Sequence, residues 1–120
     1  MKDDNLTLNE LRDKAYKIAD EHGFHENNDF ARTLMLIVSE LSEAMEADRN
    51  DKWAKECTNK TPLLDTEYEA FVKGTVEEEI ADAFIRLLDL AGTWNIDLDW
   101  HVKAKMAYNE KRPYKHGKKY

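Results

Sequence analysis

The sequence predicts an all-α fold, a four-helix bundle in one domain. Apolar residues recur every three or four positions in four stretches of the chain, and no stretch alternates apolar and polar residues as a strand does. Two of the predicted helices also begin with capping residues, at Thr7 and Thr75. With 120 residues, 42% of them hydrophobic, the chain can build one core, so a single domain over residues 1–120 is expected.

The first two helices are predicted from this period. Thr7, with Glu10 three residues later, opens a helix over residues 7–22 that Gly23 ends. Its core positions are Leu8, Leu11, Ala15, Ile18 and Ala19. The second helix is the longest and most apolar, from residue 28 or 29 to about residue 48. Its expected core stripe consists of Leu34, Ile37, Val38, Leu41 and Met45.

A loop is predicted over residues 50–74, because the helical pattern weakens there and Asn59 and Pro62 interrupt it. A short helix is expected within it, around residues 65–73. The loop is long for a compact domain, which makes it a candidate lid or substrate wall.

The third helix is predicted over residues 75–94, where Thr75 and Glu78 form a capping box. Its expected core stripe is Ile80, Phe84, Leu87, Leu88 and Ala91. A fourth helix is predicted from residue 97 or 99 to residue 110, and Pro113 ends it. The tail that follows is expected to be irregular.

Charge is unevenly distributed along the chain, whose net charge is -7. Residues 1–100 carry 11 Lys and Arg against 24 Asp and Glu, which gives -13, whereas residues 101–120 carry 7 against one, which gives +6. The acidic body argues against binding of duplex nucleic acid. The basic tail, residues 112–120, is expected either to bind anions or to dock on the acidic body.

The cellular setting is expected to be cytoplasmic. The single cysteine, Cys57, excludes an intramolecular disulfide framework. No run approaches the roughly 18 apolar residues of a membrane span, and the acidic N-terminal segment does not resemble a signal peptide. Because a chain of this size buries a modest fraction of its surface, a homo-dimer or homo-tetramer is expected.

Two pairs of acidic residues are candidates for a metal site. Glu40 and Glu43 lie three positions apart on the second helix, and Glu79 and Asp82 lie three apart on the third. If these helices run antiparallel and side by side, the four carboxylates meet and offer the oxygen ligands that suit Mg2+. The alternative is a solvated acidic face, since six acidic pairs with this spacing occur and 25 acids predict about five by chance.

Three segments together resemble the MazG-like nucleotide pyrophosphohydrolases, a family within the all-α NTP pyrophosphatases. They are SELSEAMEADR at 39–49, EEIADAFIR at 78–86 and KMAYNEKRPYKHGK at 105–118. The resemblance spans roughly residues 30–118, and residues 50–74 match no motif of the family. It implies a four-helix core, an ExxE and then an ExxD metal signature on successive long helices, and a C-terminal set of residues that grips phosphates.

The resemblance also implies roles for single residues. It makes Glu40, Glu43, Glu79 and Asp82 ligands of Mg2+, with Mn2+ as the alternative metal. The general base that activates water is expected among these carboxylates or at Glu46 on the next turn, and we select Glu43 and Glu46 as its candidates. The implied reaction converts a (deoxy)nucleoside triphosphate to the monophosphate and pyrophosphate.

The phosphate-binding candidates are Lys105, Asn109 and Arg112, which fall on one face of the fourth helix at positions i, i+4 and i+7. A solvated basic face near the helix C-terminus is the alternative to the phosphate-gripping role that the resemblance implies. Lys115 is a weaker candidate, which requires the tail to fold toward the site.

The candidates for base recognition are His25, Asn28, Phe30 and Trp53, because a base needs an aromatic face and a few polar groups. Trp53 can equally be a packing residue, and the first reading of His25 is a surface or capping histidine. Two other functions are consistent with the sequence. One is a catalytically silent helical oligomer that binds a nucleotide or a protein, and the other is a DNA-binding adaptor that uses the basic tail.

Overall fold

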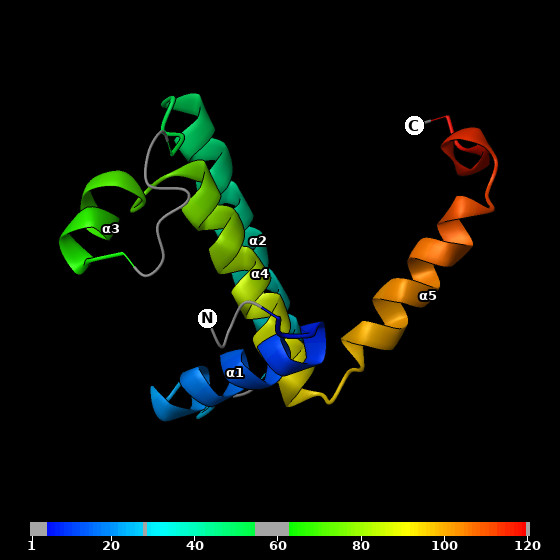
Figure 1. Ribbon diagram of the computed structural model, residues 1–120, viewed down its shortest axis with the longest axis horizontal. Coiled ribbons are helices and arrows are strands. Elements are labelled where there is room, and N and C mark those ends of the chain that lie inside the picture. The colour runs from blue at the N-terminus through cyan, green and yellow to red at the C-terminus, as the bar shows by residue number, and fades with distance from the viewer. Residues whose placement is uncertain (1–4, 28, 55–62, 120) are drawn as a thin grey trace.

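The computed structural model describes residues 5–27, 29–54 and 63–119, and this part of the chain contains helices and no strand. Five α-helices follow one another along it (Figure 1), namely α1 Leu8–Glu21, α2 Phe30–Arg49, α3 Asp65–Phe71, α4 Val76–Thr93 and α5 Leu98–Glu110. A 3-10 turn, Tyr114–Gly117, follows α5, where an irregular tail was expected. The all-α prediction is confirmed. None of the described helices is long and apolar enough to cross a membrane.

Local hydrogen bonds account for the ends of α1. The Thr7 hydroxyl accepts from the backbone of Glu10, and the Glu10 carboxylate accepts from the backbone of Thr7, both at 3.1 Å. This capping box was predicted. At the other end, Gly23 adopts a positive φ of 79°, and the backbone N–H of Phe24 reaches the carbonyl of Ala19. The helix therefore ends in a Schellman motif at the predicted glycine.

The start of α4 differs in detail from the predicted capping box. The Thr75 hydroxyl accepts from the backbone of Glu78 as expected. The Glu78 carboxylate, however, accepts from the backbone N–H of Gly74 at 2.8 Å and from the Tyr68 hydroxyl at 2.6 Å. This carboxylate therefore joins the first turn of α4 to α3.

Helices α2 and α4 lie side by side and run antiparallel (Figure 1). Where α2 ends, the backbone N–H of Val76 donates to the carbonyl of Lys52, which fixes the start of α4 beside the end of α2. The face that the helices share combines the small buried side chains of Ala44, Ala47 and Ala83 with the buried Ile37 and Leu90. Small residues allow the two backbones to approach closely, and the side chains on this face project along the same seam.

The predicted core stripes of α2 and α4 are largely wrong. Of the α2 stripe only Ile37 is buried, and of the α4 stripe only Leu88 and Ala91 are buried. The other stripe residues keep between 39% and 58% of their surface exposed, and they are Leu34, Val38, Leu41, Met45, Ile80, Phe84 and Leu87. The reason is that the alanine-rich faces, which also carry the acidic pairs, meet each other and leave the broad apolar faces outward.

Helix α1 crosses α4 near the C-terminal end of α4 (Figure 1). The crossing is tight at Gly92, where an added Cβ would lie 2.9 Å from the Cβ of Tyr16 and 3.4 Å from the carbonyl oxygen of Arg12. Glycine therefore permits this approach of α1 to α4. The C-terminal end of α1 points away from the α2–α4 pair in Figure 1, and the turn after it returns to α4, where the His25 ring contacts Asp89 at 2.7 Å.

Helix α5 is attached through its first turn. Asp99 accepts from the backbone N–H groups of Leu8 and Asn9, and the Asn9 side chain in turn contacts Asp97 at 2.9 Å and the backbone of Leu98 at 2.9 Å. The N-termini of α1 and α5 thus satisfy each other's free donors. Beyond this turn α5 projects away from the α2–α4 pair (Figure 1), and none of its residues is buried.

Candidate functional site

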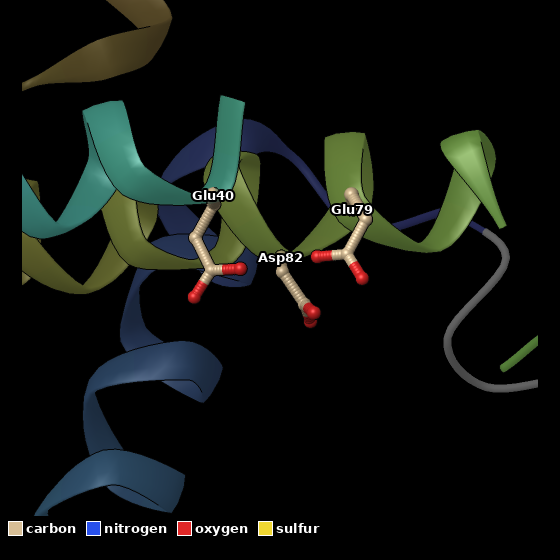
Figure 2. Close-up of side chains that lie close together, drawn as sticks. All are labelled: Glu40, Glu79 and Asp82. Atoms are coloured by element: carbon tan, nitrogen blue, oxygen red, sulfur yellow. The ribbon is translucent and has the colours of Figure 1, made fainter. Parts of the chain in front are cut away.

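Three half-buried carboxylates gather on the seam between α2 and α4. Glu40 comes from α2, and Glu79 and Asp82 come from α4, with one oxygen of each within 4.8 Å of the others. Figure 2 shows the three side chains extending from the two helices toward the same space. The spacing of three positions places Glu79 and Asp82 on one face of α4, and the antiparallel packing brings Glu40 to them. This acid group can supply several oxygen ligands to one divalent cation.

Burial and crowding of carboxylates in the acid group raise the pKa values of Glu79 and Asp82. Burial, the largest cause, together with the hydrogen bonds to Glu43 and Glu40 and the charges of Glu43 and Asp82, raises the pKa of Glu79 to about 7. One oxygen of Glu79, Oε2, is buried and has no hydrogen-bond partner among the described residues. Burial also raises the pKa of Asp82, with the charge of Glu40 as the next cause. A cation in this space would satisfy the unpaired oxygen and lower both pKa values.

Arg86 supplies positive charge at one side of the acid group. Its Nε donates to Glu40 Oε1 at 2.9 Å, and the side chains of Arg86 and Glu40 are 39% and 12% exposed. Arg86 follows Asp82 by four positions and Glu79 by seven, so all three lie on one face of α4. One guanidinium does not neutralise the acid group, since the charge of Arg86 lowers the pKa of Asp82 but leaves it raised overall.

Helix α3 approaches the acid group from the N-terminal end of α4. Burial, the hydrogen bond to Glu78 and the charges of Glu78, Asp82 and Glu79 together raise the pKa of the Tyr68 hydroxyl to about 12. The hydroxyl therefore stays protonated and donates to Glu78. This contact ties α3, which lies in the segment expected to form a lid or wall, to the turn that carries Glu79.

A cavity of about 560 Å3 adjoins the acid group. Its walls come from α1, the turn after α1, α2 and α4, and Glu40, Asp82 and Arg86 line one part of it. Most of the remaining lining is apolar, and includes Ile18, Phe24, Leu36, Ile85, Leu90 and Trp94. A pocket of this size and polarity fits a small organic molecule whose anionic end faces the carboxylates and Arg86.

The structure separates the two candidates for the general base. Glu43 lies on α2 close enough to Glu79 to raise the pKa of Glu79, although it is exposed and outside the group of three. Glu46 is 59% exposed, and its carboxylate pairs with Arg49 at 3.0 Å and with the Asn50 side chain at 3.1 Å. Glu43 therefore adjoins the acid group, whereas the carboxylate of Glu46 is held by Arg49 and Asn50 at the end of α2.

The predicted phosphate-binding residues lie on α5 and the turn after it, and the described chain does not bring them to the carboxylates (Figure 1). Lys105 Nζ and Arg112 Cζ lie 5.1 and 5.5 Å from the centre of the Tyr108 ring. Asn109 Oδ1 is buried without a hydrogen-bond partner in the described part of the chain. Lys115 is exposed and lies 5.8 Å from the Tyr114 ring.

Those base-binding candidates that the structure describes, His25, Trp53 and Phe30, are not among the residues that line the cavity. The His25 ring bridges Asp20 at 3.1 Å and Asp89 at 2.7 Å, and it lies against Tyr16. Burial alone lowers the pKa of His25, but its hydrogen bonds to Asp89 and Asp20 and their charges outweigh burial and raise it.

Trp53 donates to Asp48 at 3.0 Å and lines a different hollow of about 370 Å3, near the start of α4. Asn28 lies outside the described residues. Neither Trp53 nor His25 is therefore placed to contact a molecule in the cavity beside the acid group.

The aromatic and apolar cavity walls were not assigned to ligand binding from the sequence. Trp94 and Phe24 belong to this lining. The available signal was the presence of Leu36 and Leu90 on the acidic faces of their helices, since apolar residues on such faces indicate a covered surface. The sequence also carried a signal for Arg86, because it is the one cationic residue on the acidic face of α4.

Comparison with models of known protein families, with curated protein sequences and with solved structures finds no match to this chain. Its function is therefore inferred from its own residues and their geometry.

Proposed function

We propose that the chain is a nucleoside triphosphate pyrophosphohydrolase that uses Mg2+, or Mn2+ in its place, and that resembles the MazG-like family. The observation that carries the proposal is that the acid group borders the cavity and shares two residues with its lining. Glu40, Glu79 and Asp82 have oxygens within 4.8 Å of one another, and Glu40 and Asp82 also line the cavity of about 560 Å3. A nucleotide combines the two matching parts, an anionic phosphate chain that binds through metal and an organic nucleoside.

The acid group has the ligand chemistry of a magnesium site. Carboxylate oxygens are hard ligands, and Glu79 Oε2 is buried without a hydrogen-bond partner among the described residues, which a bound cation would supply. Mg2+ bound there would neutralise phosphate charge and make a bound water more acidic. Glu40, Glu79 and Asp82 would orient the phosphates through this cation, while the apolar walls would exclude bulk water from the nucleoside.

Glu43 is the preferred general base. It shares a hydrogen bond with Glu79 but is exposed and lies outside the group of three carboxylates, so water can reach its carboxylate. Glu46 is a weaker choice, because Arg49 and Asn50 already hold its carboxylate. In the proposed reaction the water oxygen attacks the α-phosphorus, the bond from that phosphorus to the bridging oxygen breaks, and pyrophosphate leaves.

A homo-oligomer with a completed helical bundle is part of the proposal. The chain exposes 9543 Å2, whereas a compact monomer of 14.1 kDa exposes about 6,700 Å2. Its radius of gyration is 16.7 Å, against about 13.6 Å for a compact domain of this length. The excess surface is well above the ~800 Å2 that each partner buries in a standard interface. The exposed apolar faces of α2 and α4 are where a second copy would pack.

The second copy would also deliver the cationic face of α5. A helix of 13 residues with no buried residue gains little from its own chain, and helices of this length are marginal in isolation. Residues 101–120 carry +6, while the acid group needs positive charge. We place Lys105, Asn109, Arg112 and Lys115 on the phosphate chain at the site of a neighbouring copy.

The test is a panel of ribo- and deoxyribonucleoside triphosphates with the purified chain, assayed for pyrophosphate and orthophosphate, with Mg2+ and with EDTA. The proposal requires pyrophosphate and monophosphate in equal amounts from at least one triphosphate, only with the metal. If no triphosphate yields pyrophosphate although one of them binds, the chain is a silent nucleotide-binding module. Release of orthophosphate would place the cleavage at the wrong bond and contradict the proposal.

A further inference from the structure

Arg86 occupies the boundary between the acid group and the cavity. Its Nε donates to Glu40 Oε1 at 2.9 Å, and its side chain is one of the cavity walls. The bond to Glu40 uses one nitrogen, and the guanidinium has further donors on its two terminal nitrogens. Arg86 can therefore contact the carboxylates and a cavity ligand from one position on α4.

Arg86 and a divalent cation would compete for Glu40. Glu40 is 12% exposed and belongs to the group of three carboxylates, so a cation held by that group would draw on the oxygens that Arg86 now contacts. The guanidinium keeps its charge at any relevant pH, so it cannot respond by losing a proton. It must instead find another anion, and its exposed fraction of 39% leaves the side chain room to turn.

We propose that Arg86 is a positioning residue that holds Glu40 before metal binds and, once a divalent cation takes Glu40, turns to bind the phosphate nearest the nucleoside. This inference rests on the proposed function. The place of Arg86 selects that phosphate, because the nucleoside would fill the apolar cavity on one side and the metal would hold the chain on the other. The planar fork of arginine suits two phosphate oxygens.

A purely structural ion pair and this exchange give different results when the arginine is removed. Loss of a structural pair would weaken the binding of metal and of substrate together. Loss of an exchanging residue removes a competitor for Glu40 and a ligand of the phosphate, so metal binding strengthens and substrate binding weakens. The opposite signs of the two effects identify the exchange.

The experiment compares the wild type with R86Q and R86K. Mn2+ alone is titrated without nucleotide, and KM and kcat are measured for the best triphosphate of the panel. The affinity of its non-hydrolysable α,β-methylene analogue is measured with saturating Mn2+. R49Q is the matched control, because Arg49 also pairs with a glutamate on α2 but lies outside the acid group. Circular dichroism and thermal unfolding verify that each variant is folded.

R86Q is expected to bind Mn2+ at least about threefold more tightly, because a repelling charge has gone. Its KM, and the dissociation constant of the analogue, are expected to rise about tenfold to hundredfold, the usual effect of losing a hydrogen bond between charged groups. R86K keeps the charge, so its Mn2+ affinity should stay near that of the wild type, with a KM between the other two. R49Q should match the wild type in every measurement.

Weaker binding of both Mn2+ and analogue by R86Q would show a structural pair and overturn the inference, as would an unchanged KM and analogue affinity. A wild type that binds Mn2+ and the analogue but releases no pyrophosphate would overturn the proposed hydrolysis alone. In that case, opposite effects of R86Q on the affinities for Mn2+ and for the analogue would still support the proposed exchange at Arg86. A wild type that binds neither overturns both.

Discussion

Tyr16 and Gly92 are in direct contact where α1 crosses α4, and a Cβ on Gly92 would lie 2.9 Å from the Cβ of Tyr16. The crossing has a consequence for the cavity, because Ala15 and Ile18 on α1 and Leu90 and Thr93 on α4 line it on either side of this contact. The fit between these two residues therefore sets the separation of two cavity walls.

Gly92→Val is expected to destabilise the chain by about 2 kcal/mol, in the range of overpacking substitutions. The valine side chain cannot be accommodated unless α1 moves away from α4, since Tyr16 Cβ and the backbone of Arg12 border the position. Urea unfolding followed by circular dichroism measures the change. A free energy of unfolding equal to that of the wild type would show that the crossing is looser than the structure indicates.

The stability of the metal-free chain is expected to fall as pH rises from about 4.5 to about 7. The pKa of Glu79 is about 7 in the folded chain and 4.5 ordinarily, so the folded chain binds more protons than the unfolded chain between these values. Asp82 shifts in the same direction.

Urea unfolding at pH 5 and pH 7.5 in EDTA tests this dependence, with Glu79→Gln as the variant and Asp13→Asn, an exposed acid on α1, as its control. Glu79→Gln should flatten the pH dependence, and Asp13→Asn should preserve it. Stability that rises with pH in the wild type and is indifferent to Glu79→Gln would contradict the electrostatics of the acid group. Added Mg2+ should also flatten the dependence, because it binds the deprotonated carboxylates.

Phe84→Glu is expected to dissociate the oligomer. Phe84 is 48% exposed on the apolar face of α4, where a charge would be buried without a partner in any interface with a second copy. Sedimentation velocity measures the mass of the assembly. Leu64→Glu is the control, because Leu64 is 66% exposed at the start of α3, outside this face and outside α5, and the same change there should leave the mass unaltered. A monomeric wild type, or an intact assembly in Phe84→Glu, would reject this interface.

If α5 acts on the site of a neighbouring copy, two inactive chains should complement each other. Asp82→Asn damages the acid group, and the pair Lys105→Gln and Arg112→Gln damages the phosphate-binding face of α5. Random mixing in a dimer would restore about a quarter of the wild-type activity, because half of the dimers then hold one intact site of two. Activity of the mixture equal to the average of the two separate chains would show that α5 serves its own chain.

Local signals explain how far the fold could be predicted. The caps at Thr7 and Thr75, the stop at Gly23 and the helical period depend on neighbouring residues, and they located the four longer helices closely, while the short helix expected around residues 65–73 is α3. The buried face of α2 and α4 depends on their partner, and there the prediction failed. Large apolar residues such as Leu41 and Phe84 suggested the core, whereas the chain packs its alanines and leaves those residues outward.

In the candidate site, too, the features that depend on neighbouring residues could be predicted, and those that depend on helix packing could not. The spacing of Glu79 and Asp82 on one helix face could be predicted from the helical repeat, and their contact with Glu40 followed from antiparallel helices. The cavity could not be predicted, because its walls come from three helices and the turn after α1, and their crossing angles are not local properties. For the same reason His25 was assigned to base binding, whereas Asp20 and Asp89 hold its ring.

The most direct measurement of the central claim is Mg2+-dependent pyrophosphate release by Asp82→Asn, beside the wild type and the Asp13→Asn control. The substitution keeps the shape of the side chain and removes a charge from the acid group. A loss of at least about 100-fold in kcat/KM, with the fold intact and Asp13→Asn unaffected, is the predicted result. Turnover by a folded Asp82→Asn equal to that of the wild type would show that Glu40, Glu79 and Asp82 do not hold the catalytic cation.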